Sequence, residues 1–302
     1  MDASTPEVAD LAQRIAPGSP IRDLGGAYSL NLHLETAEVV LRIHQPFISR
    51  RRLLDLQAVR RHLIARGVRG PRPLRLAGRP VFRCADRWAQ LPHRRPPEAD
   101  PETCAVLAAD LGRLDRHLRG FDGRLSRPVV ATWATPSTLR RWLSVTRAAV
   151  SADDEMAAFA AELSRQCQAI ARRWIPLRDL PAQVVHGDAT LDNLPRDDAA
   201  QSIVLDLGFS AYRPRVHDLA YTLHWTLLVM GTHAVDHFPL WTREYEDASK
   251  APLDEAERRA LPIIAAATAL HRPAIAGLAF NPVDDLRGQI GSLELARTWL
   301  RQ

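Results

Sequence analysis

Hydrophobic and polar positions alternate along the first part of the chain, and a period of two is typical of strands with one buried face. Leu30, Leu32 and Leu34 show this alternation, whereas the leucines of residues 49–65 recur at helical spacing. The elements expected in this part are a helix over 6–16, strands within 21–43 and at 74–76 and 81–84, and a helix over 49–65. The pattern therefore predicts a small antiparallel sheet accompanied by one long helix.

A stretch rich in proline and arginine, residues 91–97, separates this part from a second one in which the hydrophobic period is helical. The helices expected there are 101–118, 137–150, 155–174, 217–230, 240–248, 254–270 and 283–300. Residues 183–210 interrupt the helices and are expected to form two short strands around a polar loop. The chain is therefore predicted to be an α+β protein with an N-terminal lobe, residues 1–93, and a helical C-terminal lobe, residues 94–302.

The composition is that of a folded globular protein, because 46% of the 302 residues are hydrophobic and 25% are charged. The longest apolar runs, 219–230 and 261–270, are shorter than the roughly 18–20 residues that span a bilayer. The N-terminal segment has no basic start followed by an apolar stretch, so no secretion signal is expected. Three widely spaced cysteines argue against a disulfide framework and a zinc ribbon. We therefore expect a cytoplasmic protein that does not enter a membrane.

The net charge of +5 raises the question of nucleic-acid binding. Residues 22–95 hold 16 arginines against five acidic residues, so the basic excess is N-terminal. No helix-turn-helix, RNA-binding or paired-cysteine pattern accompanies this charge, which argues against a nucleic-acid partner. The only lysine, Lys250, lies in Ser-Lys-Ala, and this excludes the Gly-Lys-Ser/Thr loop of P-loop nucleotidases.

The residues with the clearest chemistry lie in the polar interruption of the helices. Asp188 follows a short apolar run, Asn193 comes five positions later, and Asp206 ends a second apolar run that is expected to be a buried strand over 202–206. Carboxylate and amide oxygens at such a strand end are ligands that Mg²⁺ prefers. A carboxylate earlier in the loop can accept the proton of a substrate hydroxyl during phosphoryl transfer. The loop therefore predicts a proton acceptor, Asp188, together with a metal site.

These residues also form a longer pattern. His186-Gly-Asp188 is followed by Asn193, then by Asp206 13 residues later and by Asp218-Leu-Ala a further 12 residues on. This pattern resembles that of the aminoglycoside phosphotransferase and choline kinase-like family, and the resemblance covers most of the chain. It implies a bilobal protein-kinase-like fold with a small antiparallel-sheet N-lobe and a mostly helical C-lobe. It also implies transfer of a phosphoryl group from ATP, with Mg²⁺, to a hydroxyl group of a small molecule.

The resemblance assigns roles to single residues of the loop. Asp188 matches the catalytic base of the family, and Asn193 and Asp206 match its metal ligands. His186 matches a residue that shapes the loop. Asp218 is expected to act as the N-cap or first-turn acid of the following helix and to tether the catalytic loop.

In the N-lobe, the turn that covers the nucleotide phosphates in this family corresponds to Gly25, Gly26 and Ser29. Missing side chains in such a turn let backbone amides approach an anion. The third strand of the fold usually carries a lysine that contacts the phosphates, and here Arg42 stands in its place. Arginine keeps the positive charge but presents a planar fork instead of a point charge.

A helix acid normally pairs with the cation of this strand. The candidates on the helix over 49–65 are Asp55 and Gln57, and Gln57 stands about where the acid is expected. Its neutral amide would then orient Arg42 by hydrogen bonding. Arg42 and Gln57 thus replace the usual lysine and acid, and this leaves open a non-catalytic nucleotide-binding protein that keeps the fold. A basic nucleic-acid-binding protein is a second alternative.

The acceptor is also left open by the sequence. An aminoglycoside or other antibiotic, a sugar, an amino alcohol and a homoserine-like molecule all carry a suitable hydroxyl group, and a fold by itself names none of them. The choice between ATP and GTP and the oligomeric state are open in the same way.

Overall fold

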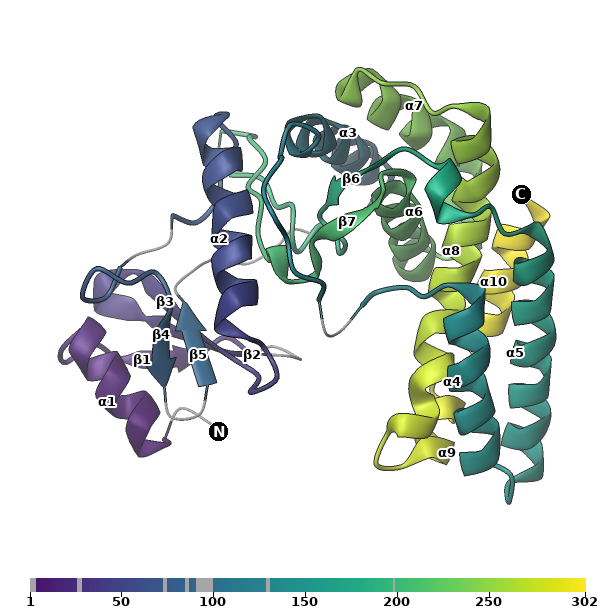
Figure 1. Cartoon of the computed structure of the whole chain (residues 1–302), viewed down its shortest axis with the longest axis horizontal. Coiled ribbons are helices and arrows are strands. Elements are labelled where there is room, and N and C mark those ends of the chain that lie inside the picture. Colours follow the sequence, from purple (N-terminus) through teal and green to yellow (C-terminus); the bar gives the residue numbers. More distant parts are fainter. Residues whose placement is uncertain are drawn as a thin grey trace. The chain divides into compact units, whose positions relative to one another are not determined.

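The computed structural model describes residues 4–25, 29–72, 75–84, 87–90, 100–128, 131–197 and 199–302 (Figure 1). The chain forms two compact units. The first consists of residues 1–97, 120–129 and 192–208, and the second of residues 98–119, 130–191 and 209–302. Two segments from later in the chain are thus built into the N-terminal unit. The predicted boundary between residues 93 and 94 lies outside the described residues and stays a prediction.

A five-stranded antiparallel sheet with the strand order β1-β2-β3-β5-β4 forms the centre of the first unit. Its strands are β1 (Ile21–Asp23), β2 (Ser29–Leu34), β3 (Val39–His44), β4 (Phe82–Cys84) and β5 (Arg87–Gln90). The expected alternation is present on β2, where Leu32 and Leu34 are fully buried and His33 is partly exposed. The predicted small antiparallel sheet is confirmed, and β5 is a strand that the pattern did not predict.

Two helices accompany this sheet. α1 (Pro6–Ile15) buries Val8 and Leu11 in the same apolar cluster as the leucines of β2 and β3. α2 (Arg50–Ala65) begins after Ser49, whose hydroxyl accepts the backbone N–H of Arg52 at 3.1 Å. Such a cap satisfies an amide that has no partner inside the helix. The predicted helix over 49–65 is therefore confirmed with its cap.

Hydrogen bonds from α2 hold the two later segments in the first unit. Asp55 accepts bonds from the backbone N–H and the hydroxyl of Ser126 at 2.8 and 2.6 Å. Arg52 donates to the backbone carbonyls of Ser126 and Gly208. The stretch that contains Asp206 is therefore positioned by α2.

The second unit is mainly helical and also contains a two-stranded antiparallel sheet. Its elements are α3 (Pro101–Leu118), α4 (Pro136–Ala149), α5 (Asp154–Arg173), β6 (Ala182–Val185), β7 (Ala211–Pro214), α6 (Val216–Met230), α7 (Phe238–Ser249), α8 (Glu255–Ile275), α9 (Pro282–Arg287) and α10 (Gly291–Arg301). α8 packs against α4, α6 and α10 (Figure 1), and every residue from Ile263 to Leu270 is buried. The predicted mostly helical C-terminal part is confirmed.

One helical stretch, Glu255–Leu278, is long and apolar enough to cross a membrane by length and composition alone. In the second unit 72% of its most apolar window is buried. This is the environment of a core helix in a soluble protein, so the stretch is weak evidence for a membrane segment.

The predicted strand over 202–206 is wrong. Ile203 makes only an isolated bridge with Arg69, and the partner of β6 is β7. The Val204 N–H donates to the carbonyl of Arg69 at 2.9 Å instead of entering a ladder. Asp206 has a φ of 27°, outside the extended range, so a strand cannot continue through it.

The predicted single helix over 283–300 is also wrong. α9 ends at Arg287, and α10 begins at Gly291. Gly288 and Gly291 lower the helix propensity of this stretch, which favours a break. The predicted strand at 74–76 lies partly outside the described residues, and Leu76 makes an isolated bridge with Arg79.

Candidate active site

The loop after β6 carries His186, Gly187 and Asp188 in the second unit, and it is held from α6. The carboxylate of Asp218 accepts the backbone N–H of His186 at 2.5 Å and that of Gly187 at 2.7 Å. Asp218 is fully buried, so these two amides satisfy a charge that would otherwise be costly to bury. The expected tether of the loop is therefore observed. Of the two expected positions, Asp218 occupies the first turn of α6, and Arg215 is the N-cap residue.

The backbone conformation and the close packing at Gly187 both require a glycine. Its φ is +85°, in the left-handed region that favours glycine. A Cβ atom at this position would lie 2.6 Å from the carbonyl oxygen of Phe209. The close approach of the loop to the start of β7 therefore depends on the missing side chain.

Asp188 is partly exposed, unlike its fully buried neighbours His186 and Ala189. The hydroxyl of Tyr221 donates to its Oδ1 atom at 2.5 Å, and its own N–H donates to Nδ1 of His186 at 3.3 Å. The Tyr221 contact was missed from the sequence. A usable signal exists, because Tyr221 follows Asp218 by three positions and such residues share one face of a helix.

A buried aromatic cluster adjoins this loop in the second unit. The ring centroids of His217 and Trp133 are 5.0 Å apart, and the guanidinium carbon of Arg213 lies 5.7 Å from the Trp133 ring centroid. Burial lowers the pKa of His217 to about 4, with Arg213 also lowering it and Asp218 opposing both effects. His217 is therefore neutral at neutral pH, and Nδ1 of its fully buried ring lies 3.7 Å from Oδ1 of Asp218.

The low pKa of His217 predicts a loss of stability in acid. An unfolded histidine binds a proton near pH 6.5, whereas the folded one binds it only near pH 4, so stability is full above pH 6.5 and falls as the pH drops towards 4. The His217→Gln variant is expected to lose about 3 kcal/mol less of its free energy of unfolding between pH 6.5 and pH 4 than the unmodified chain, since one pKa unit corresponds to about 1.4 kcal/mol. Urea unfolding at several pH values measures the effect. The exposed His233, replaced in the same way, is the control, and an equal flattening in both variants would contradict the prediction.

The start of α6 is anchored by an ion pair that is almost fully buried. Arg215 donates from Nε and Nη2 to the two carboxylate oxygens of Glu257 at 2.7 and 2.6 Å. A third donor, Nη1, reaches the carbonyl of Ala251 at 3.0 Å. The hydrogen bonds to Glu257 raise the pKa of Arg215 above its ordinary value. This bidentate pair links α6 to the first turn of α8, where Glu257 also completes a capping box with Asp254.

The first unit contains the other predicted residues. Arg42 on β3 donates from Nη2 to Oδ2 of Asp206 at 2.7 Å, and both side chains are mostly buried. The Gly208 N–H donates to Oδ1 of the same carboxylate at 3.2 Å. The Leu205 N–H donates to the carbonyl of Asn193 at 2.9 Å, which ties the Asn193 backbone to the residue before Asp206. Asn193, Asp206 and Arg42 therefore belong to one compact unit.

These residues have the chemistry of a magnesium site. Mg²⁺ is commonly held by one or two carboxylates, with waters and substrate phosphates completing its coordination. Among the described residues no group of three His, Cys, Asp or Glu side chains is placed to hold a metal. The carboxylate of Asp206 and the amide oxygen of Asn193 fit the sparse oxygen set that Mg²⁺ accepts, and their role as ligands stays a prediction.

The predicted orientation of Arg42 by a residue of α2 is wrong. Gln57 is fully buried, and neither atom of its amide has a hydrogen-bond partner among the residues described. The carboxylate of Asp55 accepts hydrogen bonds from Ser126 and none from Arg42. The partner of Arg42 is Asp206, which follows it by 164 positions and could not be paired with it from local sequence.

The predicted phosphate-covering turn is described only in part. Gly25 has a φ of +74°, and its N–H donates to Oδ1 of Asp23 at 2.8 Å. Asn31 donates to the carbonyl of Gly25 at 2.7 Å. Ser29 is buried, with its hydroxyl 3.5 Å from Nδ1 of His44. Gly26 lies outside the described residues, so the role of this turn stays a prediction.

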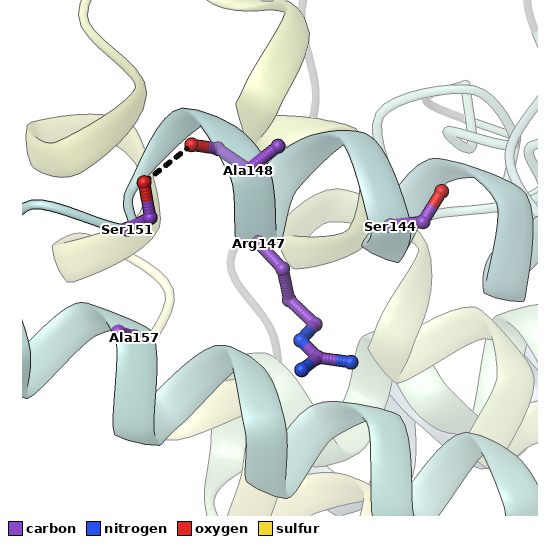
Figure 2. A pocket seen from close by; sticks show the side chains of 5 residues that line it. All are labelled: Ser144, Arg147, Ala148, Ser151 and Ala157. Atoms are coloured by element: carbon purple, nitrogen blue, oxygen red, sulfur yellow. Dashed lines mark hydrogen bonds between the residues drawn. The ribbon is translucent and has the colours of Figure 1, made fainter.

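A surface hollow of the second unit lies between α4 and α5 (Figure 2). It is lined by Ser144, Arg147, Ala148, Ser151 and Ala157. Figure 2 shows the Arg147 side chain extending from α4 towards the neighbouring helix. None of these residues was predicted to carry chemistry, and none belongs to the loop of Asp188, so the hollow is not the candidate active site.

An antiparallel sheet with one long helix in one unit, and a His-Gly-Asp loop tethered from a buried helix in the other, are features that the resemblance in the sequence implied. Residues 20–261 match the model of the "Phosphotransferase enzyme family". The chain belongs to this family, which confirms the resemblance derived from the sequence. The chain is therefore a small-molecule kinase with a hydroxyl group as acceptor.

The chain is also similar to known kinases at several levels of sequence identity. A homoserine kinase of Methylocella silvestris is 30% identical over 250 residues, which cover 79% of this chain and 73% of the relative. An amicoumacin kinase, solved with AMP-PNP and Ca²⁺, superposes with a TM-score of 0.71 at 13% identity, covering 96% of this chain and 93% of the other. A microcompartment-associated aminopropanol kinase gives a TM-score of 0.70 at 16% identity, covering 96% and 95%. The two structures show the fold, so the predicted bilobal protein-kinase-like α+β fold is confirmed.

Proposed function

We propose that the chain transfers the terminal phosphoryl group of ATP to the hydroxyl group of a small amino alcohol of the homoserine type. The observation that carries the chemistry is the loop of Asp188, which is held by two backbone N–H hydrogen bonds to the buried Asp218 and in which Asp188 is partly exposed. The acceptor class is supported by the homoserine kinase that is 30% identical to this chain. The three cysteines are free and buried, which suits a reducing compartment, and a cytoplasmic location is part of the proposal.

In this mechanism Asp188 binds the acceptor hydroxyl and accepts its proton as the new phosphate ester forms. The Tyr221 hydroxyl donates to Oδ1 and restrains the orientation of this carboxylate. Arg42 offsets the negative charge of the phosphates. Asn193 and Asp206 would hold Mg²⁺, which supplies charge neutralisation on the phosphoryl oxygens when bound.

The acceptor class can be tested with a panel of hydroxyl compounds. Release of ADP is measured with homoserine, with 3-amino-1-propanol, which is homoserine without its carboxylate, and with choline and an aminoglycoside. We expect kcat/KM for homoserine to exceed that for the other compounds by at least about tenfold, because a site built for a polar group discriminates against analogues that lack it.

The outcomes separate the two parts of the proposal. A clear preference for another member of the panel would overturn the acceptor class and leave phosphoryl transfer standing. No ADP release with any acceptor, together with no basal ATP hydrolysis in the presence of Mg²⁺, would instead support the non-catalytic nucleotide-binding alternative.

A further inference from the structure

α2 carries a buried positive charge that the roles given so far do not use. Arg60 is 7% exposed, and its Nη1 atom has no hydrogen-bond partner among the described residues. Burial lowers its pKa to about 10, so the guanidinium group keeps its charge at neutral pH. A buried charge without a full set of partners is costly, which makes the surroundings of Arg60 informative.

The charges that act on Arg60 are those of the candidate nucleotide site. Arg42 lowers its pKa further, and Asp206 opposes this by raising it. The Asp206 carboxylate already accepts bonds from Arg42 and from the Gly208 N–H. Arg42 is bonded to this carboxylate and Arg60 lies within its electrostatic influence, so these three groups together carry an excess of positive charge.

Unpaired donors accumulate in the same cluster. Nε of Arg42 is buried without a hydrogen-bond partner in the described part of the chain, as is Nη1 of Arg60. Gln57 precedes Arg60 by three positions, which places both on one face of α2, and its amide is likewise unpaired. An anion with several acceptor oxygens satisfies such a set better than a neutral group, and a phosphate is such an anion.

We propose that Arg60 binds the phosphate groups of the nucleotide together with Arg42, so that α2 contributes a second cation to the site. Asp206 can then hold a metal ion while two arginines offset the phosphate charge. This inference rests on the proposed use of ATP but not on the identity of the acceptor. Arg60 is thus a binding residue on α2, the helix on which the family resemblance implies an acid.

The test compares Arg60→Met with Arg61→Met in the full chain. Arg61 is the neighbouring arginine on α2 and is exposed, so it is a matched control. Isothermal titration calorimetry gives the affinities for ATP, ADP and adenosine. We expect Arg60→Met to weaken ATP and ADP binding by about 10- to 100-fold, as for a lost hydrogen bond to a charged group. Adenosine binding, and all three affinities of Arg61→Met, are expected to stay unchanged.

A second variant, Arg60→Lys, keeps the charge without the planar fork and is expected to recover part of the ATP affinity. Circular dichroism shows whether each variant is folded. If Arg60 only offsets the charge of Asp206, a folded Arg60→Met variant will bind ATP as the unmodified chain does, or will lose ATP and adenosine affinity equally. Either result overturns the inference alone, whereas an unmodified chain that binds no ATP overturns it together with the proposed function.

Discussion

The Asp188→Asn variant is expected to lose turnover by about 10²- to 10⁴-fold, the range that a positioned general base contributes. Asparagine has nearly the same size and can still accept the Tyr221 hydroxyl through its carbonyl oxygen, but it cannot accept the proton of the substrate. The loop is held by Asp218 through backbone amides, so its conformation does not depend on the changed side chain. ADP release at saturating ATP and acceptor measures the loss, and calorimetry is expected to show nearly unchanged ATP affinity.

Asp192 provides the matched control for this experiment. It lies in the same polar loop, and it is exposed. Asp192→Asn removes one negative charge from the loop without touching Asp188, so its turnover is expected to stay close to that of the unmodified chain. A loss of similar size in both variants would show a general effect of charge, and unchanged turnover in Asp188→Asn would contradict the role of the base.

The largest expected effect on stability comes from Glu257→Ala. The side chain of Glu257 is fully buried, and that of Arg215 is 9% exposed. Removing the carboxylate leaves the Arg215 charge without its bidentate partner, and breaking a buried pair in this way costs about 3–5 kcal/mol. The capping box of α8 is lost in the same variant. Urea unfolding at neutral pH measures the change in the free energy of unfolding.

An exposed ion pair of the same unit serves as the comparison. Arg301 donates to Glu294 at 2.8 Å, and the two side chains are 61% and 56% exposed. Glu294→Ala is expected to cost less than about 1 kcal/mol, because solvent screens exposed pairs. A loss for Glu257→Ala no greater than that for Glu294→Ala would show that the buried pair does not anchor α6 to α8.

The helices and the catalytic loop could be predicted because their signals are local. The leucines of α2 recur at helical spacing, and Ser49 precedes its first residue as the cap. Asp188 and Asn193 are only five positions apart in the sequence. Such signals need no knowledge of distant partners. The structure accordingly agrees with the sequence where neighbours along the chain decide the conformation.

The break between α9 and α10 has a local cause in Gly288 and Gly291, but the other errors arise where distant partners decide. The apolar run over 202–206 has the composition of a strand, but its amides bond to Arg69 and Asn193 and its last residue is left-handed, so no ladder forms. Arg42 pairs with Asp206 across 164 positions, which no pattern on α2 indicates. Arg60 is one of many arginines in this basic segment, and the sequence does not show that it is buried while many of the others are exposed.

Phosphorus NMR of the unmodified chain with ATP, Mg²⁺ and homoserine gives the decisive observation, because it follows the phosphorus atom itself. We expect a phosphate monoester resonance to appear as the ATP resonances decline and those of ADP grow, with no such change in Asp188→Asn. Conversion of ATP to ADP and inorganic phosphate alone, or a monoester formed equally well by Asp188→Asn, would contradict phosphoryl transfer to the acceptor by the Asp188 loop.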